Sequence, residues 1–173
     1  ARSGILELEM QSGYPVWLLV FVRMIANLVL NLVIVVVLII VFYFLSSISL
    51  KEIGSVLLTL LINLPSLFGM FGMGLLIGSV NLKEKGTNSI TLIVQALLLF
   101  LGNVSAPLTF VWQNSIPFAQ GIEIMRAIYL GIPVSFLSVL VYLLVNAIWL
   151  AAGIVVFDRT LHHERVYGTF DTY

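Results

Sequence analysis

The sequence predicts an all-α protein: a polytopic transmembrane helical bundle with four membrane spans and a re-entrant helical pair between the last two. Composition is the first reason, because 61% of the 173 residues are hydrophobic and only 9% are charged, whereas a soluble domain has about 25% charged residues. Charge distribution is the second, because Asp, Glu, Lys and Arg are absent from residues 24–50, 53–82, 86–122 and 127–157. Each segment exceeds the roughly 20 residues that cross a bilayer core as a helix.

Composition also excludes several classes of function. The formal net charge is zero and cysteine is absent, so nothing indicates nucleic-acid binding, and disulfides and thiolate metal sites are excluded. No cleavable signal peptide is visible. We therefore interpret residues 1–173 as a single membrane domain, with no catalytic residue, metal ligand or cofactor-binding residue of its own.

A short amphipathic segment occupies residues 3–12, SGILELEMQS. Its side chains divide into an apolar group and an acidic pair: Ile5, Leu6 and Leu8, then Glu7 and Glu9. Pro15 ends the segment, because proline cannot continue a helix and restrains the residue before it. From these residues alone, a surface helix without a partner is an equally good interpretation.

The first predicted span covers residues 17–45. Arg23, Asn27 and Asn31 recur every four residues and therefore share one helix face. Polar groups that face lipid are costly, so the stripe faces other helices or a wet cavity. Hydrogen bonding between helices and the lining of a pathway both remain open.

The second predicted span covers residues 55–80. Gly74 and Gly78 form a small-xxx-small pair, a spacing that lets helix backbones approach closely in lipid. Close packing is the favoured role for this pair, and a ligand contact is the alternative.

The third and fourth spans are predicted at residues 89–103 and 133–157, and a polar tail at 158–173 leaves the membrane. Orientation follows from the excess of Lys and Arg in cytoplasmic loops. The side that holds both termini carries six of these residues and the opposite side carries only Lys51 and Arg126. The N-terminal segment and the C-terminal tail are therefore predicted to be cytoplasmic.

Residues 104–132 form the predicted re-entrant segment. Pro107 and Pro117 break it into two short helices, and Glu123 and Arg126 can pair at i,i+3. Irregular backbone at membrane depth is tolerated where protein or a wet cavity surrounds it. The alternative is a plain amphipathic loop lying on the membrane surface.

Several stretches resemble the type-2 family of ATP-binding cassette (ABC) transporter permeases. RSGILELEMQSGYP is similar to the family's cytoplasmic stretch, an Arg-rich GTLE followed by a proline, with Gly4, Ile5, Leu6 and Glu7 on the GTLE positions. GMGLLIGSVNLKEKGTNSI resembles its Gly-rich span end and cytoplasmic turn. In LLLFLGNVSAPLTF, the pair Pro107-Leu108 matches a PL pair. IPFAQGIEIMRAIYLG is similar to a segment of the type NPLTYAIEALRALLLG, with these residues in register: Pro117, Ile122, Glu123, Arg126 and Gly131.

The resemblance implies the permease subunit of an ATP-driven exporter for a hydrophobic or amphipathic substrate. No GxxxxGK[ST] phosphate-binding loop occurs in the sequence, so ATP and Mg²⁺ are expected on a separate ABC ATPase subunit, present in two copies. Gly4, Ile5, Leu6, Glu7, Leu8 and Glu9 are the expected ATPase-coupling residues. A homodimer or a paired permease in the cell membrane is implied. The resemblance also implies that these are spans three to six of a six-span chain, and the stretch between the two prolines is shorter than in the family.

Two rival functions remain at this point. A passive channel or structural membrane subunit needs no ATPase. An intramembrane enzyme needs ionisable or nucleophilic groups at membrane depth, and the predicted spans hold no carboxylate or histidine. Glu123 with Arg126 is the best catalytic candidate, but a structural ion pair is the favoured interpretation.

Overall fold

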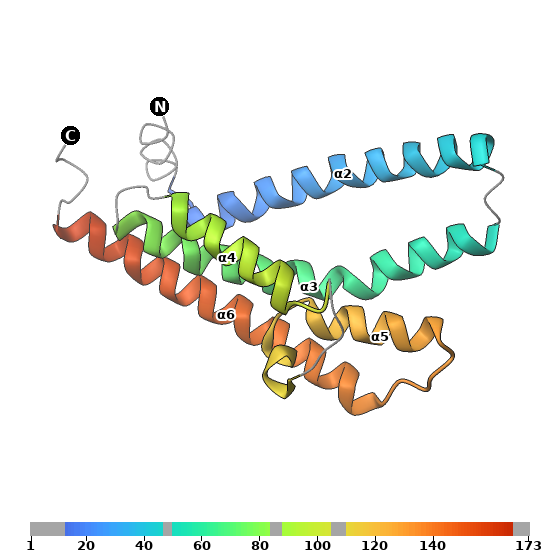
Figure 1. Cartoon of the computed structure of the whole chain (residues 1–173). Coiled ribbons are helices and arrows are strands. Elements are labelled where there is room, and N and C mark those ends of the chain that lie inside the picture. The colour runs from blue at the N-terminus through green and yellow to red at the C-terminus, as the bar shows by residue number, and fades with distance from the viewer. Residues whose placement is uncertain (1–12, 47–49, 84–87, 105–109, 168–173) are drawn as a thin grey trace. The chain divides into compact units, whose positions relative to one another are not determined.

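The computed structural model describes residues 13–46, 50–83, 88–104 and 110–167. In these ranges the protein is all-helical and contains no strand, which confirms the predicted fold class (Figure 1). The elements in chain order are α2 (Val16–Ser46), α3 (Leu50–Lys83), α4 (Asn88–Leu101), the 3₁₀-helix η1 (Val111–Ser115), α5 (Ala119–Tyr129) and α6 (Phe136–Tyr167). Packing divides the chain into two compact units, residues 1–60 and 61–173, and each is described by itself.

The N-terminal unit consists of α2 and the first turns of α3. α2 begins directly after Pro15, whose carbonyl accepts a hydrogen bond from the Leu18 N–H at 2.9 Å. Val, Ile and Leu surround the helix on all sides, and none of the apolar window of this span is buried within the chain. Apolar residues of both helices, among them Leu38 and Ile53, line a cavity of about 360 Å³. The exposed apolar surface is what a helix in contact with lipid or with other helices presents.

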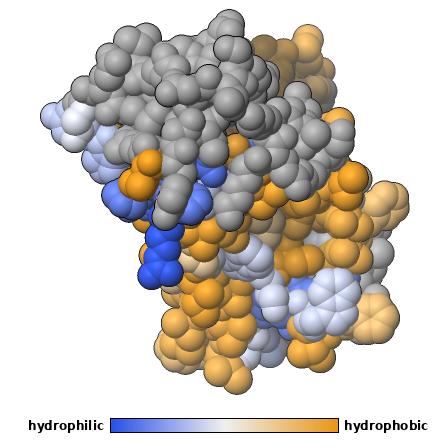
Figure 2. Space-filling view, turned by 90° about the vertical axis from the view of Figure 1, so that its left-hand side faces the viewer, coloured by the Kyte–Doolittle hydropathy of each residue, from blue (hydrophilic) through white to orange (hydrophobic). Residues whose placement is uncertain are grey.

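The C-terminal unit is built around the contact between α3 and α6. Its buried apolar residues come from these helices, from α5 and from the turn that follows η1: Phe71, Met73, Leu75, Ile116, Ala119, Ile124, Met125, Tyr142, Phe157 and Leu161. α5 packs on α6 and on η1 (Figure 1). Figure 2 shows one face of the molecule, where hydrophobic side chains cover most of the coloured surface and hydrophilic ones gather in a few patches.

Glycines bring α3 and α6 together. A Cβ on Gly72 would lie 2.6 Å from the Leu150 Cα and closer still to the Trp149 carbonyl, and a Cβ on Gly153 would meet the Gly72 backbone. A Cβ on Gly69 would overlap the Asn146 side chain. The two helices cross with almost no side chain between their backbones, as small residues allow in a membrane.

Three helices of the described chain are long and apolar enough to cross a membrane: Val16–Leu45, Glu52–Leu82 and Phe136–Glu164. They correspond to three of the four predicted spans. α4 has 14 residues, about 21 Å of helix at 1.5 Å per residue, which is shorter than a full crossing. A crossing at the position of the third predicted span therefore stays a prediction.

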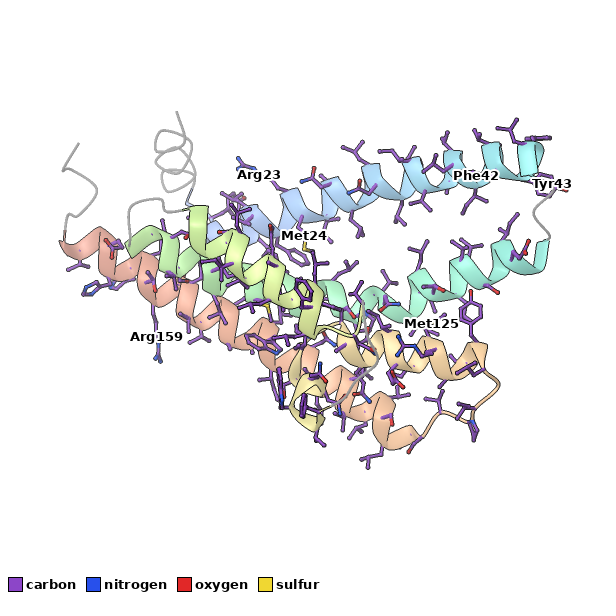
Figure 3. The ribbon with its side chains drawn as sticks, viewed as in Figure 1. Arg23, Met24, Phe42, Tyr43, Met125 and Arg159 are labelled. Atoms are coloured by element: carbon purple, nitrogen blue, oxygen red, sulfur yellow. The ribbon has the colours of Figure 1, made fainter. Side chains whose placement is uncertain are left out.

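The last helix differs from its predicted bounds at both ends. α6 begins at Phe136, after Ser135, whose hydroxyl accepts the Leu137 N–H at 3.3 Å. It continues through Tyr167, ten residues beyond the predicted end of the span at 157. Leu161 and Glu164 in this extension are buried, so packing continues the helix where hydropathy alone ends it. Arg159 lies in the same extension and projects from α6 (Figure 3).

Candidate functional site

The candidate site is a polar junction in the C-terminal unit, where the chain leaves α4 and returns through η1 and α5. α4 ends at Leu101, and the Gly102 N–H donates to the Leu98 carbonyl at 2.8 Å. Asn103 then adopts a left-handed conformation with φ 67°, which asparagine tolerates better than most residues. Its exposed fraction is 0%. The turn therefore places a polar carboxamide inside the protein.

The side chains of Asn103, Glu123 and Arg126 form hydrogen bonds with one another. Asn103 Nδ2 donates to Glu123 Oε2 at 3.0 Å and to the Ala119 carbonyl at 3.2 Å. Arg126 Nη1 donates to Asn103 Oδ1 at 2.8 Å and to Glu123 Oε2 at 2.9 Å. The predicted i,i+3 ion pair thus exists, and it closes on a third residue from another element.

The Glu123–Arg126 ion pair stabilises the junction mainly through its hydrogen bonds to Asn103. The side chains of Arg126 and Glu123 are 34% and 44% exposed, and an ion pair this accessible contributes only about 0–1 kcal/mol by itself. Asn103 is fully buried, however, and a buried amide without partners would cost about 1–3 kcal/mol. The pair therefore serves mainly to satisfy Asn103 and to hold α5 against the end of α4.

A second amide ties η1 to α4. Gln113 is buried, and its Nε2 donates to the Leu101 carbonyl at 2.9 Å. Its Oε1 accepts the Phe110 N–H at 2.8 Å. One side chain thus caps the last carbonyl of α4 and the first turn of η1, groups that a helix end leaves without partners.

α6 holds the segment from the other side. Asn146 Nδ2 donates to the Pro117 carbonyl at 3.0 Å. Trp149 Nε1 donates to the Ser115 carbonyl at 2.6 Å. Residues 110–129 therefore form two short helices, η1 and α5, that are fastened to α4 and to α6 through side chains. This matches the predicted helical pair, with a 3₁₀-helix as its first member.

An apolar groove of about 390 Å³ runs beside the junction. Helices α3, α4 and α6 and the 3₁₀-helix η1 all line it, with Leu76, Leu97 and Leu101 among the aliphatic residues and Trp112 and Trp149 as the aromatic ones. Trp112 stacks on Phe110 with ring centroids 6.2 Å apart. The groove can accommodate hydrocarbon and offers almost no polar group to a ligand.

The structure brings together only some of the residues singled out from the sequence. Glu123 and Arg126 meet at the junction, and the Pro117 carbonyl accepts a hydrogen bond from Asn146 of α6. Pro107 lies outside the described residues. The proposed coupling residues at positions 4–9 also lie outside them. Among the described residues no group of three or more His, Cys, Asp or Glu could hold a metal ion.

The polar stripe and the glycine pair lie elsewhere. Arg23, Asn27 and Asn31 are exposed on α2 in the N-terminal unit, and Arg23 projects from that helix (Figure 3). A Cβ on Gly74 would meet nothing within 4 Å, and one on Gly78 would touch only the Phe157 ring at 3.7 Å. Among the described residues the close helix contact uses Gly69, Gly72 and Gly153 instead, so a role for the five predicted positions in helix packing or in lining a pathway stays a prediction.

Sequence reasoning missed most of the network around the junction. The sequence alone assigns no role to Asn103, Gln113, Asn146 or Trp149, and Asn146 stands in the charge-free segment 127–157. The available signal was the occurrence of isolated amides in charge-free segments, because a polar group at membrane depth needs a partner. Which partner it finds is not written in the local sequence.

Comparison with known proteins agrees with this architecture. A family model described as ABC-2 type transporter matches residues 1–130, a range that contains α2, α3, α4, η1 and α5. No similar curated protein and no similar solved structure was found. Because the family match covers most of the chain and includes the whole polar junction except its anchors on α6, this multi-pass membrane protein belongs to the family of ABC-2 type transporters.

Proposed function

We propose that the chain is the permease subunit of an ATP-driven exporter and forms the translocation pathway for a hydrophobic or amphipathic substrate. The observation that carries the proposal is the ABC-2 family match over residues 1–130. The sequence contains no phosphate-binding loop, so a separate ABC ATPase subunit binds ATP and Mg²⁺ and hydrolyses the nucleotide. Two ATPase subunits act on two permease units, because one unit of this size cannot enclose a pathway.

The polar junction supports a structured closure of that pathway. Asn103 and Gln113 bond backbone carbonyls at the first residue of α5 and the last residue of α4, and Asn146 bonds the Pro117 carbonyl between η1 and α5. Backbone groups at helix ends and breaks need such partners at membrane depth. A loop on the membrane surface would have water for these groups. We therefore place η1 and α5 in the outer part of the membrane, as the re-entrant pair that roofs the pathway.

The apolar groove supports the substrate class. Its walls carry hydrocarbon and two indole rings, and apolar pockets with few polar groups bind apolar ligands. A strongly ionic substrate would find no compensating charge there.

The first prediction concerns the energy source. The ATPase encoded by the neighbouring reading frame is expected to co-purify with this chain in detergent at one ATPase per permease. In liposomes that contain both proteins, movement of a fluorescent (NBD-labelled) phospholipid is expected to require ATP. The measurement is the fraction of probe that becomes accessible to dithionite with time.

A partner ATPase whose phosphate-loop lysine is changed to alanine provides the matched control, because the complex assembles without hydrolysis. Probe movement that continues with this partner would favour the passive channel. A chain that binds no ATPase and moves no probe would favour the structural subunit.

The second prediction concerns the coupling segment. Residues 4–9 are proposed to dock on the ATPase through Ile5, Leu6 and Leu8, with Glu7 and Glu9 meeting basic residues, since a few apolar anchors suffice for such docking. Glu7→Lys combined with Glu9→Lys is expected to abolish ATP-dependent transport while membrane insertion is unchanged. Transport and ATP hydrolysis are measured on the same liposomes.

Glu52→Lys is a suitable control, because it reverses an acidic charge outside the proposed docking segment. Unchanged transport in the double variant would remove the coupling role from this segment. The native chain has no cysteine, so Ser3→Cys also reports the side of the membrane. Labelling of Ser3→Cys by an impermeant maleimide on intact cells would place the segment outside the reach of an ATPase.

A further inference from the structure

α3 is interrupted in its hydrogen bonding at Pro65. Proline inside a helix lacks an N–H and removes one hydrogen bond of the i→i−4 series, yet α3 continues through it without a break from Leu50 to Lys83. The next donor along the helix is the Ser66 N–H, whose regular acceptor is the Ile62 carbonyl. At this donor and acceptor, α3 forms hydrogen bonds with a side chain of another helix.

The Tyr142 hydroxyl of α6 bonds both of these groups. It accepts the Ser66 N–H at 3.1 Å and donates to the Ile62 carbonyl at 2.9 Å. The Ser66 hydroxyl is 2.7 Å from the same oxygen and can donate to it. A phenol has one donor and two acceptor positions, so all three are used. A side chain inserted into the i→i−4 series is a recognised cause of a helix bend.

The hydroxyl is linked to the polar junction. Asn146, one turn along α6, donates from Nδ2 to the Tyr142 carbonyl at 2.8 Å and to the Pro117 carbonyl at 3.0 Å. A Cβ on Gly121 of α5 would lie 3.1 Å from the Tyr142 hydroxyl. A displacement of α6 or of α5 therefore moves the hydroxyl relative to α3.

We propose that Tyr142 forms a switchable hydrogen-bond bridge and that α3 is a two-state hinge at residues 62–66. With the hydroxyl inserted, Ser66 and Ile62 are held apart and α3 bends. With the hydroxyl withdrawn, the Ser66 N–H bonds the Ile62 carbonyl directly and the helix straightens. Both states satisfy the Ser66 N–H and the Ile62 carbonyl, as a membrane requires of backbone groups, so a small movement of α6 can shift the population between them.

The test measures the bend in the chain reconstituted in lipid nanodiscs, without any ATPase, so its outcome does not depend on the proposed export function. Spin labels are attached at Val56→Cys and Leu137→Cys, both exposed positions, in a chain with no native cysteine. Val56 lies ten residues before Ser66, about 15 Å along the helix, and a bend of about 20° moves it by roughly 5 Å. Tyr142→Phe is expected to shift the label distance by about this amount and to narrow its distribution.

Two controls make the result specific. Labels at Val80→Cys and Val155→Cys, exposed positions on α3 and α6 beyond the hinge, are expected to give the same distance in both backgrounds. Tyr129→Phe removes an exposed hydroxyl from α5 and is expected to leave both distances unchanged. Diluting labelled with unlabelled chains excludes distances between copies.

Pro65→Ala provides a second variant that does not perturb the core. It restores the missing N–H and is expected to shift the Val56–Leu137 distance in the same direction as Tyr142→Phe. If both variants keep the distance distribution of the parent chain, or if the Val80–Val155 distance shifts equally, the hinge does not exist.

Discussion

Gly72→Ala is expected to lower the free energy of unfolding by about 1–3 kcal/mol, the usual cost of forcing an extra carbon into a packed core. The added Cβ would lie 2.6 Å from the Leu150 Cα and against the Trp149 carbonyl. Both are backbone atoms of α6, so no side chain can turn away and the helices must separate. Unfolding of the purified chain by SDS in mixed micelles, followed by tryptophan fluorescence, measures the change.

Gly74→Ala is the matched control on the same helix. A Cβ there meets nothing within 4 Å, and alanine favours a helix over glycine by roughly 1 kcal/mol, so this variant is expected to be as stable as the parent or slightly more stable. A loss of stability equal to that of Gly72→Ala would contradict the described α3–α6 contact. A Gly74→Ala variant that is stable but inactive in transport would instead support a role of Gly74 in packing or ligand contact outside the described α3–α6 interface.

Asn103→Ala is expected to destabilise the chain by about 3–5 kcal/mol, from lost hydrogen bonds to charged groups and from strain in a left-handed residue. The substitution removes the bonds to Glu123, Arg126 and the Ala119 carbonyl. It also leaves a Cβ at φ 67° without the local compensation of asparagine. The same unfolding titration measures the stability, and ATP-dependent probe movement is expected to fall with it if the junction roofs the pathway.

Asn103→Gly separates the two contributions. Glycine adopts positive φ freely, so this variant is expected to lose the side-chain hydrogen bonds and to recover about 1–2 kcal/mol of the strain. Equal stability of the alanine and glycine variants would show that backbone conformation contributes nothing at this position. Parent-like stability of both would contradict the network itself.

The membrane class of this protein follows from the sequence because it depends on summed quantities. The chain has too few polar residues to shield its long uncharged segments from water, however those segments pack against one another. The helical pair between the last two predicted spans is also a local property, since Pro117 divides it and Glu123 and Arg126 are one turn apart. These features needed no knowledge of which helices touch.

The tertiary structure decided the pairing of the polar groups and the choice of packing glycines. Asn103 and Arg126 are separated by 23 residues, and Ser66 and Tyr142 by 76 residues, so no local pattern relates them. Gly72 and Gly74 are two positions apart on one helix, yet only Gly72 faces α6. The sequence by itself thus determined that this chain lies in a membrane as helices, because transfer free energy adds up residue by residue. Which amide meets which carbonyl was decided only by the tertiary structure, because a hydrogen bond depends on how two distant helices are rotated and placed.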